Sequence, residues 1–458
     1  MFNFDDVFND ISGTDFEEVP VDIETFVTSH EYLDMGETPL SDYQYELIRA
    51  SSQIYHKDTL IALHGEEEGA RRFKSETKNE VIAALGKGST TADAEVYDPD
   101  TGKWSRMDSI LDKVSNTTAG LSGTSLNSEF ATEAFSEGYD EVFKVVTDRG
   151  HEITVNGNHK FVTKQGTVPL KDLSVGDRIA TSVRLPLTSP VEIDDREVKL
   201  LGYWIGDGMM PADHNPTLNV DFGSHEARAI EEYIEICKSY GDVPKVKKHP
   251  AKNMVFIRHS RDTPLYGIIR KHGLWGKRAG DKVIPDAVWS LPDQQVATFL
   301  SRLMGTDGSI YMKKCSGGKL NPSIEYCTIS EQLAKGVQRL FARIGISASL
   351  RSKIPSYTYK GVKKNGRRAY VLTISDMEGF KRYAEKISML DKQIHVERGL
   401  EINSKRNVIE AFNHYEGDIY WAKIKEVTPG GAEEIFTVTA TDTENYVANL
   451  VLNGNSGK

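Results

Sequence analysis

Residues 445–458 read NYVANLVLNGNSGK, and the dipeptide Asn455-Ser456 within this stretch decides how the rest of the chain is interpreted. The side-chain amide of a suitably held asparagine attacks its own backbone carbonyl and breaks the peptide bond to the next residue, where a hydroxyl group supplies a nucleophile. Far upstream, Gly88-Ser89 pairs a glycine with another hydroxyl residue. If Gly88 were joined to Ser456, the chain would read ALGKG and then SGK, a glycine-rich phosphate loop ending in its lysine. The residues between Gly88 and Ser456 therefore have the features of an inserted segment that can be excised from the chain.

This pattern resembles an intein, a self-excising segment lodged in the nucleotide-binding loop of a host protein, and the resemblance covers residues 89–455. It implies that the Ser89 hydroxyl attacks the Gly88 carbonyl and converts that peptide bond into an ester. Ser456 then attacks the ester, Asn455 cyclises to release the insert, and the remaining ester rearranges to an ordinary peptide bond. The resemblance implies no cofactor for splicing.

The chain of 458 residues is too long for a single core, and its length predicts two to four domains. The composition, with 39% hydrophobic and 27% charged residues, is ordinary for globular protein. No apolar run approaches the length of a membrane span and the N-terminus lacks a signal-peptide pattern, so we expect a cytoplasmic protein with no membrane partner. The host resemblance given below implies a bacterial cytoplasm and a gene of phage or bacterial origin. Cys237, Cys315 and Cys327 are too few and too irregularly spaced for a disulfide framework or a zinc site. The net charge of −11 is concentrated in residues 1–88, which leaves the remainder close to neutral and free to be locally basic.

Short β-rich runs bounded by Gly, Asp and Asn occupy residues 89–190 and return over residues 413–455. Within them the run NGNHKFVT, from Asn156, resembles the intein motif T-x-x-H, and residues 173–177 resemble the turn that follows it. The resemblance implies that both parts form one all-β Hint domain, the horseshoe-shaped fold of inteins and Hedgehog-type autoprocessing domains. It also implies that His159 hydrogen-bonds the upstream scissile amide and helps it to break.

Other positions depart from the common intein pattern. Ser89 stands where cysteine is more usual, and an alcohol is a weaker nucleophile than a thiol at neutral pH. Gly454 stands where many inteins have a histidine that assists asparagine cyclisation, Thr437 replaces a frequent Asp, and Glu444 replaces a frequent His. We therefore expect slower splicing that is assisted by another group, for which Asp442 and Glu444 are both candidates.

Residues 191–412 differ in composition and contain an internal repeat with helical periodicity. LLGYWIGDG starts at Leu200 and LSRLMGTDG at Leu300, each followed by a predicted helix and then by a basic β-like stretch. Both runs resemble the LAGLIDADG motif of homing endonucleases, which implies an α+β domain with a pseudo-twofold repeat whose halves span about 195–290 and 291–410. The small residues expected to let the two motif helices approach closely are Gly202, Gly206, Ser301 and Gly305.

The two motif acids, Asp207 and Asp307, are expected side by side at the helix C-termini, where they repel each other unless a cation lies between them. The resemblance implies Mg²⁺-dependent hydrolysis of phosphodiesters, with the ion held by both acids and by Gly208 and Gly308. It also implies one catalytic-site lysine in each half: Lys282 and Lys392.

Basic residues in the stretches 245–261 and 349–372 supply the electrostatic part of DNA binding. About half of each set would face the DNA, because alternate residues of a strand point to the same side. The expected partner is double-stranded DNA, as a long asymmetric target at the intein-free host allele, bound by a monomer. The candidate DNA contacts are Lys245, Lys247, Lys248, Lys252, Arg258, Arg261, Arg351, Lys353, Lys363, Lys364, Arg367 and Arg368.

Residues 1–88 form the expected N-terminal host segment, which is mainly helical and ends in a partial phosphate loop, and residues 456–458 begin the downstream host segment. The rejoined run GKGSGK, with Gln44 in a Pro-Leu-Ser-x-Tyr-Gln context, resembles the ATPase of phage large terminase subunits, although Leu85 takes the place of the loop's first glycine. Nucleotide binding is expected only after splicing has brought together Gly86, Lys87, Gly88, Ser456, Gly457 and Lys458.

Other functions leave parts of this pattern unused. A free-standing LAGLIDADG endonuclease with a splicing-inactive Hint domain, preceded by a fragment of a DNA-packaging ATPase, explains the repeat but not Asn455-Ser456. A Hedgehog-like autoprocessing protein needs the first nucleophile but no Asn-Ser junction, and a non-catalytic interaction module requires both sites to have decayed. An insert that splices with its β domain and cuts both DNA strands with its central domain accounts for the most residues.

Overall fold

The computed structural model describes Gly65, Glu67 and residues 89–110, 116–211, 220–250, 253–259, 263–315, 318–359, 361–405, 414–440 and 442–454. The chain divides into two compact units, Met1–Gly86 and Lys87–Lys458. The helices predicted for the N-terminal host segment lie outside the described residues. Within the described part of the chain, no helix is both long enough and apolar enough to cross a membrane.

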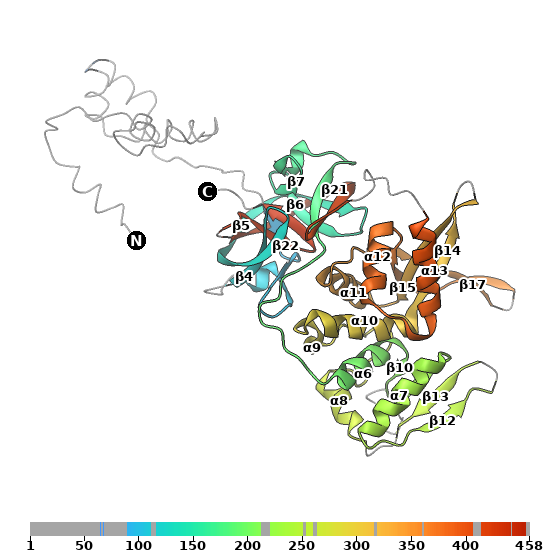
Figure 1. The fold of residues 1–458 in the computed structure, drawn as a ribbon. Coiled ribbons are helices and arrows are strands. Elements are labelled where there is room, and N and C mark those ends of the chain that lie inside the picture. The colour runs from blue at the N-terminus through green and yellow to red at the C-terminus, as the bar shows by residue number, and fades with distance from the viewer. Residues whose placement is uncertain are drawn as a thin grey trace. The chain divides into compact units, whose positions relative to one another are not determined.

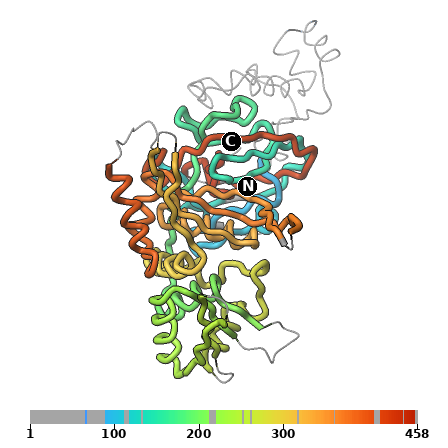
Figure 2. The backbone as a smooth tube through the Cα atoms, turned by 90° about the vertical axis from the view of Figure 1, so that its right-hand side faces the viewer, coloured from blue at the N-terminus to red at the C-terminus, as the bar shows by residue number. Residues whose placement is uncertain are grey.

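A thirteen-stranded antiparallel sheet combines strands from both ends of the second unit. Its main path runs in the order β3-β2-β22-β23-β9-β21-β1-β6-β5-β4, with β7, β8 and β20 attached at its side. Figure 2 shows the strands from the two ends interleaved, blue to teal from the first part and dark red from the last. The thirteen strands are β1 (Thr90–Thr91), β2 (Glu95–Tyr97), β3 (Trp104–Arg106), β4 (Asn116–Ser122), β5 (Ser125–Thr147), β6 (Glu152–Asn156), β7 (Lys160–Thr163), β8 (Gly166–Pro169), β9 (Arg178–Ser182), β20 (Tyr415–Glu416), β21 (Ile419–Ala440), β22 (Asn445–Ala448) and β23 (Val451–Gly454).

The two longest strands, β5 and β21, pair along most of their length and change register at four places. At one of these, Gly138 lies opposite Ile435 and Ser136 lies opposite Phe436, so Glu137 is the extra residue of a β-bulge. Gly138 has a φ of +87°, a left-handed conformation that glycine adopts without a steric penalty. The bulge turns the Glu137 side chain away from the alternation of the surrounding strand.

The residues that come between these two sets of strands in the sequence form two smaller sheets with the same strand order, which lie beside the large sheet (Figure 1). The first sheet has the order β10-β11-β13-β12, and the second has the order β14-β15-β19-β16. In each sheet the strand that comes last in the sequence therefore lies between the second strand and the third. A separate hairpin of β17 and β18 extends the second half. This order confirms the internal repeat predicted from the sequence.

Each half begins with the helix that carries its nine-residue motif. The first half contains α6 (Asp195–Gly206), β10 (Gly208–Met209), β11 (Asp221–Ser224), α7 (Ala227–Ser239), β12 (Lys245–Lys248), β13 (Val255–Arg258), α8 (Leu265–Lys271) and α9 (Asp286–Trp289). The second contains α10 (Asp293–Asp307), β14 (Gly308–Lys314), β15 (Leu320–Thr328), α11 (Glu331–Arg343), β16 (Ser349–Lys353), β17 (Ser356–Tyr359), β18 (Val362–Asn365), β19 (Ala369–Ile374), α12 (Met377–Lys386) and α13 (Gln393–Ser404).

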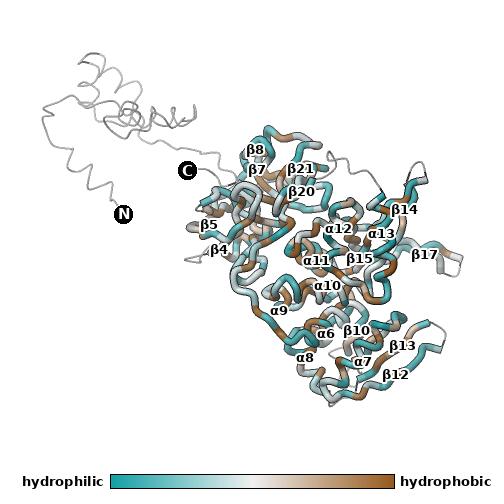
Figure 3. The backbone as a smooth tube through the Cα atoms, in the orientation of Figure 1, coloured by the Kyte–Doolittle hydropathy of each residue, from teal (hydrophilic) through white to brown (hydrophobic). Residues whose placement is uncertain are grey.

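The largest hydrophobic core surrounds the pair α6 and α10. Leu200, Leu201, Tyr203 and Trp204 are all fully buried, although they point to different sides of α6. A helix that is apolar on all sides must be covered on all sides, and here α10 and α7 both pack against it. Figure 3 shows the contrast between hydrophobic stretches in these inner helices and the mainly hydrophilic strand β12.

The turn between β5 and β6 contacts the second half of the central region. The Arg149 carbonyl accepts hydrogen bonds from the Gln338 side chain, at 3.0 Å, and from the Leu350 N–H, at 2.9 Å. Its guanidinium group forms an ion pair with Asp376 at 3.2 Å and donates to the Tyr420 hydroxyl. Arg149 therefore joins the large sheet to α11, β16 and the start of α12.

Candidate functional site

Ser89 lies just before β1 and is completely buried. Its N–H donates to Oδ1 of Asn156 at 3.0 Å, and the Asn156 N–H donates to the Ser89 carbonyl at 3.1 Å. Asn156 Nδ2 donates to Asp140 at 2.9 Å, so the amide group is oriented with its oxygen toward Ser89. The asparagine that departs from the T-x-x-H motif thus binds the nitrogen of the predicted upstream scissile bond.

The Ser89 hydroxyl donates a hydrogen bond of 2.5 Å to Oε2 of Glu137, the bulge residue of β5. Sequence reasoning missed this carboxylate. Glu137 is far from Ser89 in the chain and lies in no motif, so the only signal was the Ser136-Glu137-Gly138 break in the β pattern, whose meaning depends on strand register.

His159 is fully buried, and its Nε2 lies 2.9 Å from Oδ1 of Asn453. Asn453 Nδ2 donates to the Val451 carbonyl at 2.8 Å, so its oxygen faces the histidine and accepts a hydrogen from Nε2. In the neutral ring this assigns the hydrogen to Nε2 and leaves Nδ1 as the basic nitrogen. The predicted histidine is therefore fixed by a residue of β23, two positions before Asn455.

Gly454 packs closely against β7. A Cβ atom added there would lie 3.1 Å from the Lys160 Cβ and 3.3 Å from the Lys160 carbonyl oxygen. A histidine at this position would require β7 to shift, which gives a steric reason for the glycine. Of the other departures, Thr437 is buried in β21 and Glu444 has a left-handed φ of 54°.

Several predicted residues of the splicing and nucleotide sites lie outside the described residues. They are Gly86, Lys87, Gly88, Asn455, Ser456, Gly457 and Lys458. Among the predicted splicing residues, the structure therefore describes Ser89 and His159 directly.

In the central region, α6 and α10 approach closely at glycines of the first motif. A Cβ at Gly202 would lie 2.6 Å from the Phe299 carbonyl oxygen, and one at Gly206 would lie 2.0 Å from Oγ1 of Thr306. Gly202 and Gly206 therefore lie at the close contact between the two helices, as the sequence predicted. The prediction for Gly305 was wrong, because an added Cβ there would meet no neighbouring atom within 4 Å.

We expect the substitution Gly202→Ala to lower the free energy of unfolding by about 1–3 kcal/mol, because its Cβ would overlap backbone atoms of α10 that cannot move independently. Gly305→Ala is the matched control, and it should stabilise the helix by about 0.5–1 kcal/mol, since alanine lowers backbone entropy in the unfolded chain. Urea unfolding monitored by tryptophan fluorescence compares the two variants. Equal effects at both positions would contradict the close approach at Gly202.

The acids that follow the motifs lie at the C-terminal ends of these helices. Asp207 caps α6 and is half-buried, and Asp307 is the last residue of α10. Burial, and after it the negative charge of Asp307, raise the pKa of Asp207 to about 7. The side chain of Asp307 is exposed, but surrounding protein atoms still desolvate its carboxylate. This desolvation raises the pKa of Asp307, although the positive charges of Lys282 and Lys392 lower it. The two carboxylates therefore interact across the junction of the halves.

The two predicted lysines occupy equivalent positions in the two halves. Lys282 Nζ donates to the carbonyls of Trp204, Ile205, Gly206 and Gly208, at 2.9–3.1 Å, and caps α6. Burial lowers the pKa of Lys282 to about 8, while both motif acids raise it. Lys392 Nζ donates in the same way at the end of α10, to the carbonyls of Thr306 and Gly308 at 3.0 and 2.8 Å.

These bonds also involve the predicted metal ligands Gly208 and Gly308. The carbonyls of Gly208 and Gly308 each accept a hydrogen bond from a lysine ammonium group. The assignment of a metal ion to Asp207, Asp307, Gly208 and Gly308 stays a prediction. The glycines also have a steric role, because a Cβ at either position would collide with the carbonyl oxygen at the end of its own helix.

The candidate DNA contacts lie on the two smaller sheets and their extensions. In the first sheet all four residues of β12, including Lys245 and Lys247, are exposed. Arg258 pairs with Lys245 in register but binds Asp221 through two hydrogen bonds of 2.8 and 2.7 Å. In the second, Arg351 is bound to Glu325 at 2.8 Å. The charges of Arg258 and Arg351 are thus locally balanced.

The remaining candidate contacts divide between exposed positions and positions that are not described. The exposed residues are Lys245, Lys247, Lys248, Lys353, Lys363, Lys364, Arg367 and Arg368. Lys252 and Arg261 lie outside the described residues.

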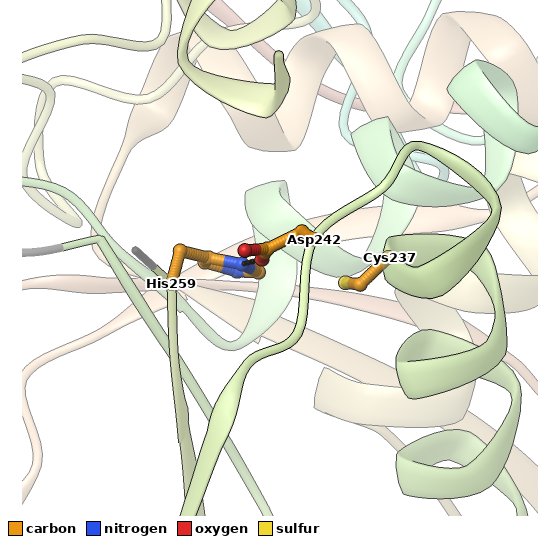
Figure 4. A group of neighbouring side chains, drawn as sticks. All are labelled: Cys237, Asp242 and His259. Carbon is orange, nitrogen blue, oxygen red and sulfur yellow. Dashed lines mark hydrogen bonds and ion pairs between the residues drawn. The ribbon is translucent and has the colours of Figure 1, made fainter. Parts of the chain in front are cut away.

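A further group of possible metal ligands, Cys237, Asp242 and His259, lies buried in the first half (Figure 4). His259 already uses both ring nitrogens, Nδ1 with Asp242 and Nε2 with the Tyr233 hydroxyl, each at 2.6 Å. Two ligands of a tetrahedral zinc ion lie about 3.3 Å apart, so the Asp242–His259 contact is a hydrogen bond. Burial raises the pKa of the Cys237 thiol to about 12, which favours the protonated thiol over a ligand thiolate. We interpret the group as a structural network that ties α7 to β13.

Comparison with known proteins supports the splicing assignment. Residues 99–455 match the family model described as intein splicing domain, and residues 4–92 match one described as the N-terminal P-loop domain of the uncharacterized protein MJ0330. The replicative DNA helicase DnaB of Rhodothermus marinus is 27% identical over 398 residues, covering 71% of this chain and 41% of the helicase. The chain therefore spans less than half the length of this relative.

Two solved structures are also similar. A crystal structure of an Ssp DnaB mini-intein variant has a TM-score of 0.31 at 11% identity and covers 82% of this chain and 98% of its own. The LAGLIDADG meganuclease I-AabMI, solved bound to uncleaved DNA, has a TM-score of 0.30 at 13% identity and covers 46% of this chain and 91% of its own. The family match and the many-stranded sheet around Ser89 and His159 agree with the Hint-type fold predicted from the sequence. On the match over residues 99–455, the chain belongs to the intein splicing domain family.

Proposed function

We propose that this chain excises residues 89–455 and joins Gly88 to Ser456, and that its central region cleaves double-stranded DNA at the insert-free host allele. The observation that carries the splicing part is the setting of Ser89, whose N–H and hydroxyl are each held by a buried or partly buried polar group. A serine fixed in this way is presented as a nucleophile beside the bond it would attack. His159 is held nearby in the same domain by β23, which leads to Asn455.

In the proposed reaction the Ser89 oxygen bonds to the Gly88 carbonyl carbon and the Gly88–Ser89 peptide bond breaks. Nδ1 of His159, whose ring begins this step protonated on both nitrogens, gives a proton to the leaving nitrogen. Ser456 takes over the acyl group, cyclisation of Asn455 releases the insert, and the final ester rearranges to a peptide bond. These steps use only groups of this chain.

The DNA-cleavage part is supported by the repeated strand order and by the two acids at the junction of α6 and α10. The raised pKa of Asp207 beside Asp307 marks a place where a cation would relieve repulsion, and carboxylate oxygens are ligands that suit Mg²⁺. Asp207 and Asp307 would hold the ion, which when bound would stabilise charge on phosphodiester oxygens. Lys282 and Lys392 hold the helix ends that position these acids.

The match of residues 4–92 to a P-loop domain supports a nucleotide-binding host whose loop is restored by splicing. The family models and relatives reported above do not name a terminase, so that host assignment stays a prediction. The alternative function is a DNA endonuclease whose splicing domain is inactive, and it predicts that the chain stays intact.

Intact mass spectrometry of the purified chain after incubation at neutral pH tests the splicing proposal. We expect one product of residues 89–455 and a second in which residue 88 is joined to residue 456. Release of residues 1–88 alone would indicate cleavage without ligation and a fault at Asn455 or Ser456. Persistence of the precursor alone would contradict splicing and favour the endonuclease alternative.

A further inference from the structure

We propose that Glu137 is the general base that activates Ser89 in the first step, a catalytic role that rests on the proposed splicing function. Ser89 Oγ is the reacting atom of that step, and Glu137 Oε2 lies 2.5 Å from it as the hydrogen-bond acceptor. A general base must lie within about 2.6–3.2 Å of the atom it deprotonates, or slightly closer for a charged acceptor. Glu137 meets this requirement directly, without an intervening group.

The backbone directs this contact. Glu137 is the extra residue between two pairs of the β5–β21 ladder, Ser136 with Phe436 and Gly138 with Ile435. On the other edge of β21, Phe436 pairs with Thr90, the residue that follows Ser89. The bulge and the nucleophile therefore lie at the same level of the sheet. Bulges next to active sites commonly redirect one side chain, and this one directs a carboxylate to Ser89.

The surroundings hold the Ser89 hydroxyl against this carboxylate. Ser89 is fully buried and its N–H is held by Asn156, so its side chain has little freedom to leave Glu137. Asn156 is in turn held by Asp140, three residues after Glu137 on the same strand. Both the position of the serine and its hydrogen-bond acceptor are thus set by one short segment of β5.

The chemistry explains why a serine would need such a group. A thiol has a pKa of about 8.5 and supplies some thiolate at neutral pH by itself, whereas an alcohol does not. In the proposed step the Oγ–H proton passes to Glu137 as Oγ bonds to the Gly88 carbonyl carbon. The C–N bond of that peptide breaks, and the nitrogen takes a proton from Nδ1 of His159, whose ring begins this step protonated on both nitrogens. When Ser456 later displaces Ser89 from the ester, the Ser456 hydroxyl proton passes to Nδ1 of His159 and protonated Glu137 returns its proton to the departing Oγ, so Ser89, Glu137 and His159 all return to their starting protonation states.

The test uses the full chain carrying Asn455→Ala, which blocks release at the downstream junction. Hydroxylamine cleaves the ester, so the rate of appearance of residues 1–88 reports the first step. We expect Glu137→Gln to slow this cleavage by about 10²- to 10³-fold, because the amide can still accept the hydrogen bond but is not basic. Glu137→Asp retains a carboxylate and should lose less. Glu141→Gln, an exposed glutamate further along β5, is the control and should leave the rate unchanged.

Repeating the test in a chain with a cysteine nucleophile distinguishes a catalytic role of Glu137 from a role in holding Ser89 in place. In the chain that carries Ser89→Cys, the thiol ionises without help, so Glu137→Gln should slow cleavage by less than about tenfold. An equal loss in the serine and cysteine backgrounds would overturn the proposal and assign Glu137 a structural role. An unchanged rate in the serine background would also overturn it. If the parent chain itself releases no residues 1–88, and Ser89→Ala matches it, the proposed splicing function fails and this inference fails with it.

Discussion

Replacing Ser89 with alanine is expected to abolish the spliced product and to lower cleavage after Gly88 by more than about 10³-fold. The Ser89 hydroxyl supplies the oxygen of the first ester, and every later step of the proposed reaction depends on that ester. Its buried position leaves little room for a water molecule to take over the same geometry. Mass analysis of the incubated chain measures the result. The only processed species expected is one cut after residue 455, since asparagine cyclisation does not require the ester.

The complementary substitution, Asn455→Ala, should allow cleavage after Gly88 while preventing release at the downstream junction. Ser109→Ala is a suitable control because Ser109 is exposed and its hydroxyl only donates to the nearby Arg106 carbonyl. The Ser109→Ala variant should splice like the parent chain.

If the Ser89→Ala variant still ligated normally, Ser89 could not be the first nucleophile.

The substitutions Asp207→Asn and Asp307→Asn are each expected to reduce DNA cleavage by at least about 10³-fold while leaving protein splicing intact. Each removes a negative charge at the junction of α6 and α10, where the charge of Asp307 raises the pKa of Asp207. An amide of the same shape preserves the packing but binds a divalent cation weakly. The assay is linearisation of a plasmid that carries the host coding sequence rejoined across the insertion point, with Mg²⁺ and with chelator.

The control for this experiment is Asp286→Asn, an exposed acid of the same region that pairs with Lys103 at 3.0 Å. It should cleave DNA normally. Loss of splicing together with cleavage in the Asp207 or Asp307 variants would point to unfolding, so splicing of each variant serves as the folding check. Full cleavage by both variants would exclude the acid pair as the metal site.

Features carried by local sequence could be predicted well. The nine-residue runs ending at Gly208 and Gly308 contain both the helix and the acid that follows it, so their repeat gave the paired helices and the acid pair. The alternation of β-rich runs gave a many-stranded domain at both ends of the insert. His159 could be found because it lies in a short motif next to the strand β7.

Features that depend on register or on the facing side of a helix could not be predicted. Glu137 reaches Ser89 only because two distant strands slip by one residue relative to each other. Asn453 lies in no motif, yet its side chain accepts the hydrogen bond that orients His159. Gly305 was predicted at the helix contact because it is a small residue of the second motif, but a Cβ added there would face open space. Spacing identifies a helix and leaves its exact rotation to tertiary packing.

The contacts of Arg149 have an evolutionary consequence. An inserted element whose target allele has become fixed in a population no longer gains from cutting DNA, so its nuclease would be free to accumulate damage. Here Arg149 of the splicing sheet is satisfied by Gln338, Leu350 and Asp376 of the central region. A mutation that unfolds the central region removes these partners from Arg149, at a cost to the sheet that holds Ser89. Under the proposed functions, selection on the host to keep splicing would therefore also preserve the fold of the central region, whereas the acids Asp207 and Asp307 would be free to change.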